Sequence, residues 1–198
     1  MNKTVEFFFD LGSPASYLGW TQLPALCERA GAQLHYRPML LGGVFQATGN
    51  ASPATVPAKG RYMATDLLRH ARRYDVQFAF NPHFPINTLG LMRGAIGYQL
   101  RQPDNFPRYL TATFRALWAE QRNLGDDAML AATLEAAGLD AQQYQAMIKD
   151  EQVKAALKAN TEEAVQRGVF GAPSFFVDGE LFFGQDRLEF VRAALGEA

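Results

Sequence analysis

Apolar and polar positions along this chain of 198 residues predict strands at both ends and helices between them. A run rich in valine and phenylalanine over residues 4–10 is typical of a buried strand. Helical spacing follows from residue 16 to residue 30 and stops at Gly31, and residues 33–39 then alternate like a second strand. This β-α-β order predicts two parallel strands joined by a right-handed crossover.

Turn-forming glycine, proline and asparagine residues are frequent over residues 40–60, which predicts a long irregular loop. Loops of this length are uncommon unless they are functional. From residue 61 to about residue 168 the pattern is almost entirely helical. Helices are expected over residues 62–74, 87–100, 105–120, 126–137, 140–148 and 151–167.

Strand character returns near the end of the chain. Residues 174–177 and 180–183 are two short apolar runs, and the Asp178-Gly179 pair between them is typical of a tight hairpin turn. A closing helix is expected over residues 187–195. The layout βαβ, helices, ββα predicts an α/β domain from residues 1–60 and 165–198, interrupted by an all-helical insertion domain over residues 61–164.

Composition excludes several classes of protein. The net charge of −1 argues against a polyanionic partner, so nucleic acid is not expected, and no apolar run is long enough to cross a membrane. The start of the chain has no signal-peptide pattern, and Cys27 is the only cysteine, which together indicate a reducing, cytoplasmic setting. We expect Cys27 to be a core residue, and the three histidines have no spacing that predicts a metal site.

Four short blocks together point to one family. The blocks are residues 9–17 (FDLGSPASY), Gly49-Asn50, residues 56–60 (VPAKG), and residues 171–174 (GAPS) with 183–187 (FGQDR). In these blocks, and over essentially its whole length, the chain resembles 2-hydroxychromene-2-carboxylate isomerases and kappa-class glutathione transferases. The resemblance implies a thioredoxin-like core with a helical insertion, glutathione as cofactor, a small aromatic substrate and a homodimer.

Ser13 is the expected catalytic residue, on the strength of this resemblance. The strand-to-helix junction of a thioredoxin-like fold carries Cys-x-x-Cys, whereas this chain has Ser13 and Ser16 at the two cysteine positions. A thiol–disulfide oxidoreductase is therefore disfavoured. Ser13 followed by Pro14 is also a common helix start, and the two roles are compatible because a helix N-terminus favours a bound thiolate.

The resemblance also implies a set of glutathione-binding residues. Asn50 and Lys59 match two of these positions, and Gln185 with Asp186 would hold the γ-glutamyl end. From their residue types alone, Asn50 is equally a turn residue, Lys59 a solvated charge and Asp186 a helix cap.

Pro173 is expected to follow a cis peptide bond, since it opens a strand opposite the strand-to-helix junction. The backbone of Ala172 would then pair with the cysteine of glutathione, as an added strand does. Ala15 departs from the family pattern, because many relatives have an aromatic residue there. The substrate pocket is therefore expected to be more open at Ala15.

The resulting hypothesis is a glutathione-dependent isomerase of 2-hydroxychromene-2-carboxylate-type intermediates of aromatic degradation. The family implies that the glutathione thiolate adds reversibly to the unsaturated substrate, a bond rotates, and elimination returns the thiol. The alternative is a kappa-class-like glutathione transferase that releases the adduct formed with a small electrophile. A third hypothesis, a glutathione-binding module without catalysis, does not account for the full set of thiol-site residues.

Overall fold

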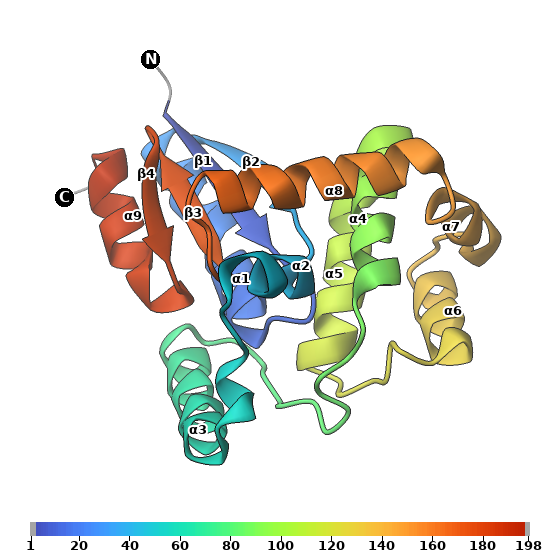
Figure 1. The fold of residues 1–198 in the computed structure, drawn as a ribbon, viewed down its shortest axis with the longest axis horizontal. Coiled ribbons are helices and arrows are strands. Elements are labelled where there is room, and N and C mark those ends of the chain that lie inside the picture. The colour runs from blue at the N-terminus through green and yellow to red at the C-terminus, as the bar shows by residue number, and fades with distance from the viewer. Residues whose placement is uncertain (1–2, 197–198) are drawn as a thin grey trace.

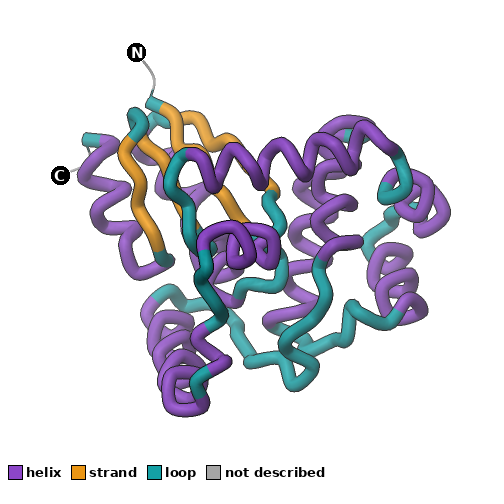
Figure 2. The backbone as a smooth tube through the Cα atoms, in the orientation of Figure 1, coloured by secondary structure: helices purple, strands orange, loops and turns teal. Residues whose placement is uncertain are grey.

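A four-stranded sheet forms the centre of the α/β part of the molecule in the computed structural model, which describes residues 3–196. The strands are β1 (Thr4–Phe9), β2 (Gln33–Pro38), β3 (Ser174–Val177) and β4 (Glu180–Phe183), in the spatial order β2-β1-β3-β4. β1 pairs in parallel with β2 and antiparallel with β3, and β3 pairs antiparallel with β4. The expected strands and the parallel first pair are confirmed (Figure 2).

Helices cover both faces of this sheet. On one face, α1 (Pro14–Ala30) and α9 (Leu188–Leu195) pack against the side chains of Phe7, Phe9 and Phe175. On the other face, α2 (Leu41–Thr48) and the long α8 (Glu151–Gln166) cover Phe8 and Phe176. Alternate residues of each strand therefore enter two separate apolar layers, as the two-residue period of a strand requires. This arrangement is the α/β thioredoxin-like class that was expected.

The remaining helices lie between α2 and α8 in the sequence. They are α3 (Pro57–Arg73), α4 (Leu89–Arg101), α5 (Phe106–Trp118), α6 (Asp127–Ala136) and α7 (Ala141–Met147). In Figure 1, α4 to α7 stand together beside the sheet, and α8 runs from this group back across the strands. Among the described residues, no helix is both long enough and apolar enough to cross a membrane. That this helical group forms a domain of its own, over residues 61–164, remains a prediction.

The prediction of a long irregular loop over residues 40–60 is wrong. Residues 41–48 form α2, Pro53–Thr55 form a 3₁₀ turn, and α3 begins at Pro57 rather than at residue 62. Two glycines within α2 hid the helix, because glycine normally disfavours a helix interior. At Gly43 a Cβ atom would lie 3.2 Å from Cγ2 of Thr161, so the missing side chain lets α2 approach α8 closely.

Candidate active site

The turn between β1 and α1 places Ser13 at the first position of the helix. Ser13 is the N-cap of α1, its Oγ accepts a hydrogen bond from the backbone N–H of Ser16 (3.1 Å), and Pro14 occupies the first helical position. The backbone N–H of Ser13 in turn donates to the carbonyl oxygen of Asp10 (3.0 Å). Ser13 is 5 % exposed, so its hydroxyl is held in one place by the turn and the helix start.

The second half of the site comes from the other end of the chain. The Ala172–Pro173 peptide bond is cis, as expected, and directly precedes β3. Because β3 pairs with β1, with Ser174 opposite Phe8, Ala172 lies against the turn that carries Ser13. The Ser13 hydroxyl donates to the carbonyl oxygen of Ala172 at 3.0 Å.

A cavity of about 900 Å³ opens beside this pair. Five of the residues predicted from the sequence line it: Ser13, Asn50, Lys59, Ala172 and Gln185. Two others do not, because Pro173 is buried against α1 and Asp186 borders a smaller pocket between α1, α3 and α9. The Asp186 carboxylate forms an ion pair with Arg187. The structure therefore brings together most of the predicted set and leaves Asp186 outside the cavity.

Asn50 acts on the shape of this cavity through the backbone. Its side-chain amide donates to the carbonyl oxygen of Phe170 (2.8 Å), and its Oδ1 accepts from the N–H of Ala51 (2.8 Å). The first of these bonds attaches the loop after α2 to the segment that leads into Ala172, and the second lies within the loop. In this structure both polar atoms of Asn50 are occupied by the chain itself.

One face of α3 contributes three residues that were not predicted beside the predicted Lys59. Tyr62, Met63 and Asp66 line the cavity together with Lys59, and their spacing of three or four residues puts all four on the same side of the helix. Of the described residues lining the cavity, Lys59 is the only cationic one. The signal was present in the sequence, but it becomes visible only when the helix begins at Pro57.

Another group of lining residues is apolar. Its members come from α2 and from the segment before α4, and they include Leu41, Phe45, Phe84, Pro85 and Ile86. Ala15 also lines the cavity.

Two aromatic rings border the cavity near Ala172. The rings of Phe170 and Phe183 lie 4.6 Å apart between centroids, and both side chains are partly exposed. A Cβ atom on Gly171 would lie 2.6 Å from the ring of Phe183, so glycine is needed for the ring to lie there.

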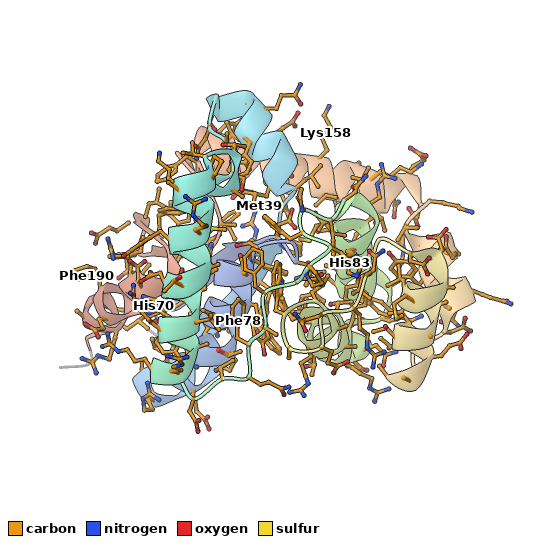
Figure 3. All side chains as sticks on the ribbon, turned by 90° about the horizontal axis from the view of Figure 1, so that it is seen from below. Met39, His70, Phe78, His83, Lys158 and Phe190 are labelled. Atoms are coloured by element: carbon orange, nitrogen blue, oxygen red, sulfur yellow. The ribbon has the colours of Figure 1, made fainter. Side chains whose placement is uncertain are left out.

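Residues expected to have no catalytic role are not among those that line the cavity. Cys27 is buried on α1, and burial raises the pKa of its thiol to about 11, which makes it unreactive near neutral pH. Trp118 is fully buried and donates through its indole N–H to the carbonyl oxygen of Leu11 (2.8 Å). His83 is exposed on the connection between α3 and α4, and His70 lies on α3 (Figure 3).

Ser16, at the position of the second cysteine, is fully buried, and its Oγ has no hydrogen-bond partner. An unsatisfied buried hydroxyl costs about 1–3 kcal/mol. We expect Ser16→Ala to raise the free energy of unfolding by about 1 kcal/mol and to leave turnover within about twofold, because the hydroxyl does not line the cavity. Denaturant unfolding and steady-state rates measure the two effects. A large loss of turnover would show that Ser16 takes part in the reaction.

Comparison with known proteins places this chain in a family. The chain matches the model of the DsbA-like thioredoxin domain over residues 4–196. It is 33 % identical to a 2-hydroxychromene-2-carboxylate isomerase of Sphingobium xenophagum, covering 98 % of this chain and 99 % of that protein. It is 32 % identical to glutathione S-transferase kappa 1 of Homo sapiens, covering 98 % and 92 % of the two chains.

Solved structures agree with the sequence relatives. A 2-hydroxychromene-2-carboxylate isomerase superposes with a TM-score of 0.85 at 28 % identity, over 98 % of this chain and 94 % of that one. A probable DsbA oxidoreductase from Streptomyces coelicolor has a TM-score of 0.71 at 21 % identity, over 100 % and 92 %, and shows the shared fold alone. The chain therefore belongs to the DsbA-like thioredoxin-domain family, in the branch that contains 2-hydroxychromene-2-carboxylate isomerases and kappa-class glutathione transferases.

Proposed function

We propose that this protein is a glutathione-dependent isomerase of 2-hydroxychromene-2-carboxylate-type intermediates of aromatic degradation. The observation that carries the proposal is the pair formed by Ser13 and Ala172 at the edge of an open cavity. A hydroxyl at a helix N-terminus and a backbone carbonyl lie together where a thioredoxin-like fold holds sulfur. The chain has no cysteine at this junction, so the nucleophile comes from a small-molecule thiol.

The groups around the cavity fit glutathione. Ser13 offers a hydroxyl for the sulfur, Ala172 a backbone carbonyl for the cysteine N–H, and Lys59 a cation for a carboxylate. Gln185 supplies a further amide for the γ-glutamyl end. Bound glutathione would supply the thiolate for reversible conjugate addition to the substrate.

Ser13 stabilises the thiolate form of that sulfur. A free thiol has a pKa of about 8.5, so only a few per cent is ionised at pH 7. A hydrogen bond to a charged group contributes roughly 1.5–3 kcal/mol, which corresponds to about one to two pKa units. The N-terminus of α1 favours the negative charge as well. Serine is redox-inert, so it performs this role without trapping the thiol as a mixed disulfide.

The hydrogen bonds of Ser13 must change partners when glutathione binds. A serine hydroxyl has a single proton to donate, and in this structure it goes to the carbonyl oxygen of Ala172. In the complex, a backbone N–H of glutathione would donate to the carbonyl oxygen of Ala172 in place of the Ser13 hydroxyl. The Ser13 hydroxyl can then donate its hydrogen bond to the sulfur, while its Oγ still accepts from the N–H of Ser16.

The γ-glutamyl ammonium group of glutathione requires a carboxylate partner, and the family resemblance assigns this role to Asp186. Asp66 is better positioned, because it lines the cavity on the same face of α3 as Lys59. Its carboxylate lies 3.5 Å from Arg69 and 3.7 Å from His70 at partly exposed pairs, which contribute little and can be exchanged for a ligand. We therefore include Asp66 in the proposed binding set and retain Asp186 as an outer residue of the same end.

The apolar part of the cavity is the proposed site for the aromatic substrate. Leu41, Phe45, Phe84 and Ile86 form its walls, and Ala15 leaves room beside Ser13. Burial of the aromatic ring of the substrate against such walls is favourable, and it would place the unsaturated group of the substrate near the sulfur.

The decisive test is turnover of 2-hydroxychromene-2-carboxylate with and without glutathione, with free thiol titrated during the reaction. We expect product to accumulate with no net loss of thiol, and little product without glutathione, because the chain has no thiol at the site. Stoichiometric loss of thiol would favour the transferase alternative. Full activity in thiol-free buffer would contradict the role of glutathione.

The proposal extends to the assembly and its setting. We infer a homodimer in the cytoplasm, where glutathione is abundant and a lone thiol such as Cys27 stays reduced. Sedimentation or light scattering would measure the dimer directly.

A further inference from the structure

Asp10 is a buried acid that no step of the proposed reaction uses. It follows β1, is 1 % exposed and lines the cavity beside Gly12 and Ser13. Among the ion pairs between described residues, none involves Asp10. Burial raises the pKa of its carboxyl group, whereas hydrogen bonds from backbone N–H groups act in the opposite direction. A buried acid without a cationic partner requires some other explanation.

The carboxylate of Asp10 joins parts of the chain that are distant in sequence. One oxygen, Oδ1, accepts from the backbone N–H of Gly12 (2.8 Å), and the other, Oδ2, accepts from that of Leu41 (2.8 Å). Thr88, also buried, lies beside the same carboxyl group, where its hydroxyl favours the ionised form. At Gly12 a Cβ atom would lie 2.7 Å from Cγ2 of Thr88 and 3.3 Å from Oδ1 of Asp10, so this contact is closely packed.

Each of these partners belongs to a different wall of the cavity. Gly12 precedes Ser13 in the turn, Leu41 begins α2 and its apolar wall, and Thr88 directly precedes α4. The first N–H groups of a helix have no partner within it, and a carboxylate is favourable there. One side chain thus sets the distance between the thiol-binding turn and two walls of the substrate pocket.

We propose that Asp10 is a positioning residue, which holds Ser13 in register with the apolar walls so that sulfur and substrate carbon meet. The proposal rests on the proposed function. A displacement of reacting groups by about 1 Å costs about 10²-fold in rate. The expected effect of loosening this link is therefore on turnover, since the proposed glutathione contacts at Ala172 and Lys59 do not depend on Asp10.

The test is Asp10→Asn, which keeps the size of the side chain but turns one acceptor oxygen into an NH₂ group. That group must face the N–H of Gly12 or Leu41, so one of the two bonds is lost. We expect kcat to fall about tenfold or more, while the Kd of glutathione, measured by calorimetry, stays within about threefold. The matched control is Asp140→Asn, at the N-cap of α7, where asparagine caps as well as aspartate.

The measurements separate positioning from stability. Thermal unfolding gives the folded fraction of each variant, and a fall in kcat that only follows this fraction would overturn the proposal. Parent-like kcat in Asp10→Asn would overturn it as well. If Asp10→Asn does not fold, Thr88→Val removes the hydroxyl beside the carboxyl group and should lower kcat about threefold with unchanged Kd. Absence of glutathione binding to the parent protein would instead refute the proposed function, and with it this role.

Discussion

Ser13→Ala should fold, bind glutathione and lose most of its activity at pH 7. Loss of the N-cap costs about 1 kcal/mol, which a domain of ordinary stability tolerates. Loss of the hydrogen bond to sulfur should raise the pKa of the bound thiol by about one to two units, so the rate falls about tenfold or more. The rate deficit should shrink as the pH rises, because the thiol then ionises without help.

The pH–rate profiles of Ser13→Ala and the parent measure this shift, and Ser16→Ala is the matched control from the same turn. Glutathione affinity should stay close to that of the parent. The variant loses the hydrogen bond to sulfur, but glutathione no longer has to displace a serine hydroxyl from the carbonyl oxygen of Ala172. Equal apparent pKa values in the two profiles would mean that Ser13 is only a helix cap and that the proposed chemistry is wrong.

Gly94→Ala should cause a large loss of stability without touching the proposed site. A Cβ atom there would lie 2.5 Å from the hydroxyl oxygen of Tyr109 and 2.5 Å from the ring of Tyr144. Both tyrosines are buried, and Tyr109 donates to the carbonyl oxygen of Leu91, so neither side chain can move away easily. Overpacking costs about 1–3 kcal/mol, and two closely held neighbours at 2.5 Å put Gly94→Ala at the upper end of this range. The preference of a helix for alanine over glycine, about 1 kcal/mol, offsets part of that cost.

We expect the free energy of unfolding of Gly94→Ala to fall by about 2 kcal/mol, and the Tm by about 4–8 °C. The control is Gly42→Ala in α2, where a Cβ atom meets nothing within 4 Å and the helix should gain up to about 1 kcal/mol. Denaturant unfolding of both variants gives the comparison. A stability of Gly94→Ala equal to that of the parent would mean that the tyrosine cluster rearranges.

Local patterns were enough to predict most of the secondary structure. The run of phenylalanines in β1 and the hairpin at Asp178-Gly179 were predicted because strand periodicity and turn residues are properties of neighbouring positions. Both turn residues do have positive φ, 50° at Asp178 and 85° at Gly179. α2 was missed because its glycines argued against a helix. The reason for Gly43 is a close contact with Thr161, which is more than a hundred residues away in the chain.

Some features of the candidate site were also predictable from neighbouring residues, and others depend on contacts between distant segments. The sequence by itself determined the chemistry of the strand-to-helix turn: a serine at the helix start, no cysteine beside it, and a proline that opens β3. These features depend on residue type and on order along the chain. A resemblance over several blocks then indicated glutathione at Ser13 and Ala172.

Only the tertiary structure decided which side chains share the cavity. It brought in Asp66 through the earlier start of α3, left Asp186 beside a different pocket, and gave Asp10 partners on two other segments. These contacts are set by how helices pack against the sheet, a property that neither residue type nor local spacing contains. The physical reason is that a buried carboxyl group such as Asp10 requires hydrogen-bond donors, and the folded chain supplies them from positions far apart in sequence.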